Sequence, residues 1–160
     1  MNRFNQLVLA AMLLLFFGTS AIAGTLVLKV TAKKETEVVT PDGKKVIQYV
    51  DVDSVVPGNV LLYSINYHNQ GAEKAEAVVI ANPIPEHMVY VPGSAQGAGT
   101  IVRFSVDNGK TFDVPEHLII VENGKTRPAT AADYTNIQWS FKKDVSPDGK
   151  GSVEYRARLK

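Results

Sequence analysis

Apolar and polar residues alternate along much of the chain after residue 24, which predicts β-strands with one buried face. No window of useful length shows the 3.6-residue period of an amphipathic helix. The clearest alternating segments are Thr25–Lys33, Val60–Asn69, Asn136–Phe141 and Gly151–Lys160. The residues predicted to share the inward faces of these strands are Leu26, Leu28, Val30, Ala32, Leu61, Tyr63, Ile65, Tyr67, Ile137, Trp139, Phe141, Val153, Tyr155, Ala157 and Leu159.

Turn sequences separate these segments at the spacing that antiparallel strands need. Pro and Asp-Gly occur in TPDGK at 40–44 and in SPDGK at 146–150, and Asn-Gly occurs in VDNGKT at 106–111 and VENGKT at 121–126. Asn-Gly between strands is the strongest two-residue hairpin signal. The two similar stretches are open to two interpretations, a repeated binding loop or one turn chemistry used twice, and the second is favoured. The pattern predicts an all-β, antiparallel fold of eight to ten strands, a sandwich or a barrel.

The first residues have the pattern of a secretory signal peptide. Arg3 supplies a positive start, Leu7–Phe17 is an unbroken apolar run, and Ala21-Ile22-Ala23 is a small-x-small cleavage site. The alternative is a membrane anchor, but a helix of this run would rise only about 16 Å, roughly half the hydrocarbon thickness. We therefore expect residues 1–23 to be a signal peptide and residues 24–160 to be one domain. The protein is expected to be exported, periplasmic or extracellular, with no membrane span after cleavage.

Charge and cysteine content narrow the possible functions. The chain has 17 basic and 16 acidic residues, and cleavage would remove one basic residue, Arg3, so the remainder is close to neutral. This balance gives no basic excess for binding nucleic acid or anionic membranes. The absence of cysteine excludes disulfides, thiol catalysis and cysteine-ligated metals.

The stretches PGNVLLYSINYHNQG at 57–71 and AEAVVIANPIPEHMVYVPGSA at 75–95 resemble a known family. The family is the immunoglobulin-like repeat of bacterial and archaeal surface proteins catalogued as domain of unknown function eleven. The resemblance implies an antiparallel immunoglobulin-like β-sandwich and a structural role at the cell surface. Asn82 stands where the family usually has Asp, and the chain holds a single copy of a domain that usually occurs in tandem. The matching residues are Pro57, Gly58, Tyr63, Asn69, Gly71, Pro83, Pro85, Tyr90, Val91, Pro92, Gly93 and Ser94.

Two prolines, Pro83 and Pro85, interrupt the chain between strand-like segments. Proline lacks the backbone donor that a central strand needs, so a strand is expected to end here. We expect 82–85 to cross from one sheet to the other, with Ile84 at the edge of the core, and 87–91 to resume pairing. The alternative is a proline-rich ligand segment. It is disfavoured because the stretch is shorter than a PxxP recognition motif.

Candidate chemistry is sparse. His68, His87 and His117 are isolated in sequence and are expected to be scattered rather than metal ligands. Asp51 and Asp53 share a strand phase and could hold Ca²⁺, but without an Asp-x-Asp-x-Asp-Gly loop a solvated face is favoured. No Gly-x-Ser-x-Gly occurs, and the Gly-rich stretch 93–100 is expected to be a flexible loop rather than a phosphate cradle. We therefore assign no catalytic, cofactor-binding or metal residues and expect no enzyme activity and no cofactor.

Two classes of function remain open. One is a non-catalytic structural or interaction module of the cell envelope or extracellular matrix, acting through protein–protein contacts that include edge-strand pairing with itself. The other is a glycan- or ligand-binding module using exposed aromatics among Tyr49, Tyr63, Tyr67, Tyr90, Tyr134, Tyr155 and Trp139. An exposed aromatic row would favour the second, and a long free edge strand would favour the first. The strand Thr25–Lys33 is expected to pair in its own domain, with donation to a neighbouring copy as the alternative.

Overall fold

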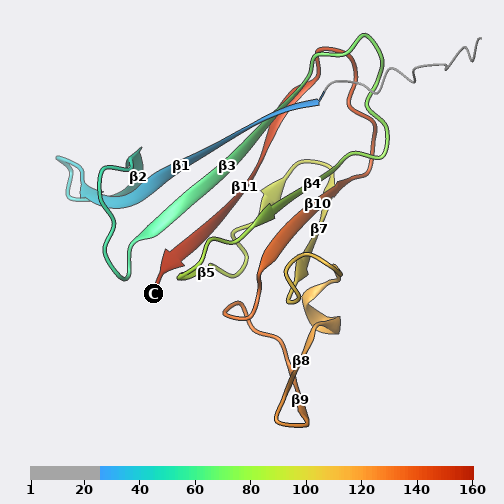
Figure 1. The fold of residues 1–160 in the computed structure, drawn as a ribbon. Coiled ribbons are helices and arrows are strands. Elements are labelled where there is room, and N and C mark those ends of the chain that lie inside the picture. The colour runs from blue at the N-terminus through green and yellow to red at the C-terminus, as the bar shows by residue number, and fades with distance from the viewer. Residues whose placement is uncertain (1–25) are drawn as a thin grey trace, which may run out of the picture.

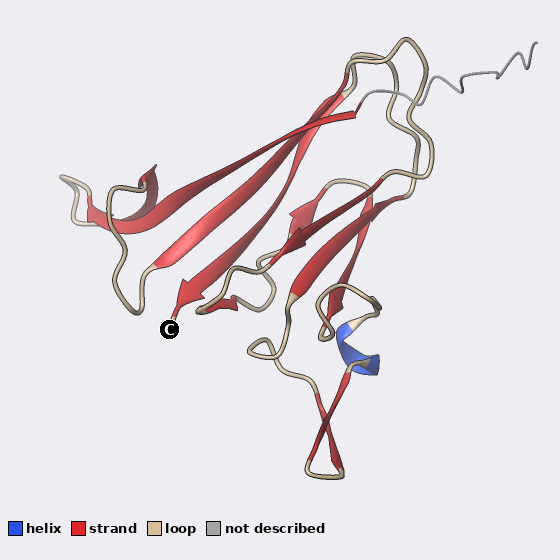
Figure 2. Cartoon of the chain, viewed as in Figure 1, coloured by secondary structure: helices blue, strands red, loops and turns tan. Residues whose placement is uncertain are grey.

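The computed structural model describes residues 26–160, which form antiparallel β-sheets with one short 3₁₀ helix, η1 (Pro115–His117) (Figure 2). The predicted signal peptide lies outside the described residues. No helix within residues 26–160 has the length and apolar character needed to cross a bilayer. The strands are β1 (Leu26–Val39), β2 (Lys45–Asp51), β3 (Val60–Asn69), β4 (Val79–Pro83), β5 (Met88–Tyr90), β6 (Gln96–Gly97), β7 (Thr100–Ser105), β8 (Ile119–Glu122), β9 (Lys125–Pro128), β10 (Asn136–Phe141) and β11 (Lys150–Leu159).

The prediction of an all-β antiparallel fold is confirmed, but the expected number of strands is too low. The described residues hold eleven strands. Strands β5, β6, β8 and β9 have only two to four residues each. A segment this short cannot display period-two alternation, so the sequence pattern does not reveal it.

The strands form two main sheets and a separate hairpin (Figure 1). The larger sheet has the order β2-β1-β3-β11-β5, and β6 also pairs with β11. The smaller sheet has the order β4-β10-β7, and β8 pairs with β9. The β8–β9 hairpin projects away from the two main sheets (Figure 1). Strands that are distant in the sequence therefore pair with each other, as β3 does with the final strand β11.

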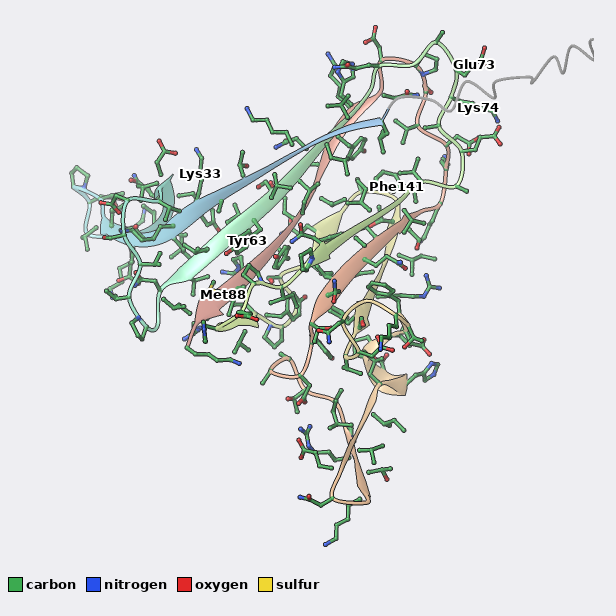
Figure 3. The ribbon with its side chains drawn as sticks, viewed as in Figure 1. Lys33, Tyr63, Glu73, Lys74, Met88 and Phe141 are labelled. Atoms are coloured by element: carbon green, nitrogen blue, oxygen red, sulfur yellow. The ribbon has the colours of Figure 1, made fainter. Side chains whose placement is uncertain are left out.

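Buried side chains of the two sheets form one core. Trp139 of β10 and Tyr155 of β11 are both 0% exposed, and their ring centroids lie 6.1 Å apart. Tyr63 stacks on Tyr155 within the larger sheet at 5.0 Å, and Tyr67 meets Phe141 of the smaller sheet edge-on at 5.0 Å. Figure 3 labels Tyr63 on the larger sheet and Phe141 on the smaller one. The predicted inward phases of β3, β10 and β11 are confirmed, with Trp139 at the centre of the core.

The segment that joins β4 to β5, residues 83–87, is called the proline corner, and it crosses between the sheets as the sequence predicts. Strand β4 ends at Pro83, and the next strand, β5, begins at Met88 in the other sheet. Ile84 between them is buried and donates its backbone N–H to the Thr135 carbonyl at 2.8 Å. The corner is a structural crossing between sheets, because the prolines end one ladder and the chain starts another.

Strand β1 departs from the predicted pattern of burial. The register places Leu28 opposite Tyr67 and Val30 opposite Ile65, so these residues do share the core-facing side. Nevertheless Leu28 is 46% exposed and Val30 is 54% exposed. The prediction of a buried face is therefore wrong for Leu28 and Val30, whereas Leu26 and Ala32 on the same face are half-buried. The reason is that β1 and β2 extend away from β4, β10 and β7, so the smaller sheet does not cover them (Figure 1).

Candidate interaction surface

Strand β2 forms one edge of the larger sheet and is paired on one side only. Among the described residues its ladder partner is β1, and every residue from Lys45 to Asp51 is exposed. An edge with free backbone groups is where another strand can add. Four of its residues carry large apolar side chains with exposed fractions of 36%, 49%, 40% and 39%, namely Val46, Ile47, Tyr49 and Val50.

A tight turn fixes how β2 follows β1. Gly43 adopts φ of 80°, the left-handed region that glycine favours, and its N–H donates to the Thr40 carbonyl at 2.8 Å. The Thr40 hydroxyl donates to the Asp42 carboxylate and to the Lys44 carbonyl. Lys45 then pairs with Glu37 at 2.7 Å across the hairpin. Because the turn is fixed, the register of β2 against β1 is fixed as well.

One ion pair holds the β1–β2 hairpin to the rest of the sheet, and a second ties β1 to the residues that follow β2. Arg156 of β11 donates from Nη1 to Glu35 Oε2 of β1 at 2.9 Å, and this carboxylate raises the pKa of the guanidinium. Lys34 Nζ lies 3.0 Å from Asp53 Oδ1, and it lowers the pKa of that carboxyl. The first contact joins residues 121 positions apart in the sequence, and the second closes the hairpin locally. The open edge is therefore presented by an anchored strand.

The two aspartates considered for Ca²⁺ have separate surroundings. Asp51 is the last residue of β2, whereas Asp53 lies beyond the strand and is engaged by Lys34 and by the Ser54 backbone N–H. A lysine ammonium in contact with a carboxylate competes with a cation for the same oxygen atoms. Within residues 26–160 no cluster of three or more His, Cys, Asp or Glu side chains is arranged to hold a metal ion.

The three histidines lie on different parts of the fold and are not brought together as one site. His68 on β3 lies 3.0 Å from Asp148, and His117 in η1 lies 3.2 Å from Asp113. His87 is in the proline corner with φ of 64°, where its carbonyl accepts from the Lys160 N–H. The Asp148 pKa is lowered chiefly by its hydrogen bond to His68. His68 and His117 therefore each form a surface pair with one aspartate.

Part of the glycine-rich stretch 93–100, which the sequence predicts to be a flexible loop, forms a short strand. Gln96 and Gly97 form β6 and pair with Glu154 and Val153 of β11. The hydroxyl of Ser94, a buried residue, accepts from the Arg156 backbone N–H at 3.0 Å. The small residues let this segment lie directly on the core, so the stretch is structural.

The aromatic side chains do not form an exposed row in the described part of the chain. Of the seven aromatic residues that could stack on sugars, Tyr49 is the one that is exposed, and the others are buried or half-buried.

One pocket of about 410 Å³ has aromatic walls, from Tyr90, Phe104 and Tyr134. The Phe104 and Tyr134 rings stack at 4.4 Å, and Phe104 is only 5% exposed. The rings therefore pack largely on one another.

The two Asn-Gly turns share positive φ at both residues but have different supports. Asn123 and Gly124 have φ of 53° and 72° and join β8 to β9 directly, as the sequence predicts. Asn108 and Gly109 also have positive φ, but the loop that holds them is organised by the Asp107 carboxylate. That carboxylate accepts from the Ser105 hydroxyl and from the Lys110 and Thr111 backbone N–H groups.

The β8–β9 hairpin carries a second exposed apolar spot. Ile119 and Val121 are 57% and 67% exposed. Arg127 braces the base of the hairpin with two 2.8 Å hydrogen bonds to the Asp133 carboxylate and a further contact to Glu122. The spot is narrower than the β2 edge, since only these two apolar residues of the hairpin are largely exposed.

The open edge of β2 is a feature that alternation alone does not identify. The segment KVIQYVD has apolar residues in both phases, so neither face is marked as the buried one. The charge pattern of the strand nevertheless marks it as unusual for an exposed edge. The strand has a lysine at one end, an aspartate at the other and no charge between them, whereas exposed edges usually carry interior charges or prolines.

Comparisons with protein-family models, with curated proteins and with solved structures gave no match. The family resemblance of residues 57–95 therefore stays a hypothesis.

Proposed function

We propose that the chain is a non-catalytic exported structural or interaction module of the cell envelope or extracellular matrix. It acts through protein–protein contacts, and the open β2 edge is its principal contact surface. The supporting observation is that this edge combines free backbone groups with four exposed apolar side chains on a strand held in place by the β1–β2 turn. Strand addition uses both features, since the ladder supplies affinity and the side chains supply specificity.

At the level of fold we propose an immunoglobulin-like β-sandwich. Successive strands alternate between the sheets: β3 and β5 belong to the larger sheet, and β4 and β7 belong to the smaller one. Later in the chain, β10 lies between β4 and β7, and β11 lies between β3 and β5. Such interleaving of early and late strands is typical of Greek-key sandwiches. The motif residues support the same fold. Asn69 and Tyr90 are buried, and their side-chain polar atoms bond to backbone groups.

Site-specific photo-crosslinking tests the proposed surface. A photoreactive amino acid would be placed at Gln48 on the open edge, and in a matched variant at Lys143, an exposed bend between β10 and β11. We expect crosslinked products from the first position in the exporting host, identified by mass spectrometry as an envelope protein, a matrix protein or a second copy. Equal, background-level products at both positions would contradict the proposal.

Export is a separate part of the proposal. The intact mass of the secreted protein is expected to correspond to loss of residues 1–23. A product that retains Leu7–Phe17 in the membrane would contradict export in this form.

The pocket with aromatic walls supports a second candidate, a glycan- or ligand-binding module. A half-buried Tyr134 beside Tyr90 offers apolar ring surface at a pocket of about 410 Å³. Titration with oligosaccharides, monitored by NMR, tests this function. Binding that is lost in Tyr134→Ala but kept in a Tyr49→Ala control would favour it over the interaction module.

A further inference from the structure

The β2 sequence is chemically self-complementary when it is read antiparallel to itself. Reversing KVIQYVD about its central Gln48 places Lys45 opposite Asp51, Val46 opposite Val50, and Ile47 opposite Tyr49. Each apolar residue then meets an apolar residue, and each charge meets its opposite. Cross-strand pairs of these kinds stabilise antiparallel ladders, whereas like charges directly opposite each other destabilise them.

We propose that two copies of the chain associate through their β2 strands, antiparallel and centred on Gln48, so that the larger sheets become continuous. This inference rests on the proposed function and names its partner as a second copy. The pairing is isologous, because the same surface is used twice about a twofold axis. It therefore closes after two copies and leaves no β2 edge free for further addition.

Backbone geometry restricts the register to very few choices. Only alternate residues of β2 direct their backbone N–H and C=O groups toward the open edge, because the others face β1. Residues that pair across two copies must therefore be both odd-numbered or both even-numbered. The register centred on Gln48 meets this condition and pairs every residue of β2. Moving the centre to Ile47 or Tyr49 leaves strand ends unpaired and puts a charge opposite an apolar side chain.

The two faces of the joint have distinct compositions. Directly opposed residues project to the same side of a sheet, so Val46 and Val50 of both copies flank the central Gln48 pair on the side that β1 residues Leu28 and Val30 also occupy. On the other side, Ile47 and Tyr49 of each copy meet, with a Lys45–Asp51 pair at each end. The Lys45 ammonium already contacts Glu37 in its own copy, so the carboxylate of Asp51 would join an existing ion pair.

Charge reversal at the two ends tests the register directly. The protein would be expressed as the full chain in an exporting host, and its self-association measured by sedimentation equilibrium. Lys45→Glu alone and Asp51→Lys alone each create two like-charge contacts per dimer. We expect each variant to weaken dimerisation by about tenfold or more. Lys143→Glu, a reversal away from the edge, is the control and is expected to leave dimerisation unchanged.

Mixing the two single variants separates the proposed pairing from simple damage to the fold. In a mixed dimer Glu at 45 of one copy faces Lys at 51 of the other, and the unchanged Asp51 faces the unchanged Lys45. The mixture is therefore expected to form heterodimers of roughly the original strength. Weak association of each variant alone, without recovery on mixing, would overturn the proposed register.

A single cysteine tests the position of the twofold axis, and the cysteine-free chain gives a clean background. Gln48 is the one residue that faces its own counterpart, at a Cβ separation of about 4.5–5.5 Å in such a ladder. Gln48→Cys is expected to form an intermolecular disulfide on mild oxidation, and Lys143→Cys is not.

A wild-type protein that stays monomeric at millimolar concentration would overturn the inference. If the protein stayed monomeric but a crosslinker at Gln48 captured other envelope proteins in the host, self-pairing would be rejected and the proposed function would stand.

Discussion

At the scale of single residues, Asn69 shows how one side chain organises several segments. It is fully buried, its Nδ2 donates to the carbonyls of Glu73, Val145 and Ser146, and its Oδ1 accepts from the Gly71 N–H. The end of β3, the following loop and the approach to β11 are thus joined at one point. This gives a physical reason for an asparagine at position 69, two residues before Gly71.

We expect Asn69→Ala to lower the free energy of unfolding by about 2–3 kcal/mol, because buried carbonyls lose their donor. Asn66→Ala, at an exposed position on the same strand, is the matched control and is expected to stay within about 0.5 kcal/mol. Urea denaturation followed by circular dichroism measures both. Equal stability of the two variants would show that water replaces the Asn69 amide.

Trp139 is the largest fully buried side chain, and among the described residues its indole Nε1–H has no hydrogen-bond partner. Trp139→Ala is expected to cost about 3–5 kcal/mol through cavity formation. Trp139→Phe should cost less, since it keeps an aromatic ring and removes an unpaired donor.

The chain has one tryptophan, so fluorescence reports on Trp139 alone. Its emission should be blue-shifted in the native protein and shift red on unfolding. Emission typical of water before unfolding would contradict burial.

At the scale of elements, the short strand β6 depends on a glycine where it crosses the core. A Cβ added at Gly97 would lie 2.9 Å from Trp139 Cδ1 and 3.0 Å from Val153 Cγ1. The absence of a side chain is what lets β6 pair with β11 above the tryptophan. Gly97 thus serves close packing, whereas Gly93 and Gly99 adopt positive φ in the flanking turns.

Gly97→Ala is expected to lower the free energy of unfolding by about 1–3 kcal/mol, because an extra methyl overpacks this contact. Gln96→Ala, the exposed neighbour on the same strand, should have little effect. Thermal melts of the two variants measure the difference. A Gly97→Ala protein as stable as the original would mean that β6 shifts outward without cost.

At the scale of the whole molecule, several carboxylates favour the folded state at neutral pH. The Asp107 pKa is held well below its usual range, first by the Ser105 hydroxyl and then by Thr111. The Asp133 pKa is lowered chiefly by Arg127. A carboxyl with a depressed pKa in the folded state binds protons more readily when unfolded, so acid favours unfolding.

The stability from these groups should therefore be complete above about pH 4, the ordinary aspartate pKa, and be lost progressively below it. We expect the melting temperature to fall between about pH 4 and pH 2. In Asp107→Asn the melting temperature should start lower at pH 6 and decline less steeply in acid. Circular dichroism melts across this range check both. If the melting temperature of the variant depended on pH in the same way as that of the original protein, Asp107 would not contribute to the loss of stability in acid.

The sequence by itself determined the strands whose pattern is locally complete. Alternation in β3, β10 and β11 identified their inward residues, Asn123-Gly124 identified a hairpin, and the prolines identified the crossing at Ile84. Each of these features depends on the φ and ψ preferences of neighbouring residues or on period-two geometry, so a short segment carries the information.

Only the tertiary structure decided which faces and edges are covered. Alternation placed Leu28 and Val30 on one face, but their exposure depends on how far the smaller sheet extends, which is set by residues distant in the chain. Likewise the β2 segment contains no information about whether a strand lies on its far side. The open edge, and with it the proposed contact surface, follows from the order of strands, because nonlocal pairing decides which backbone groups stay free.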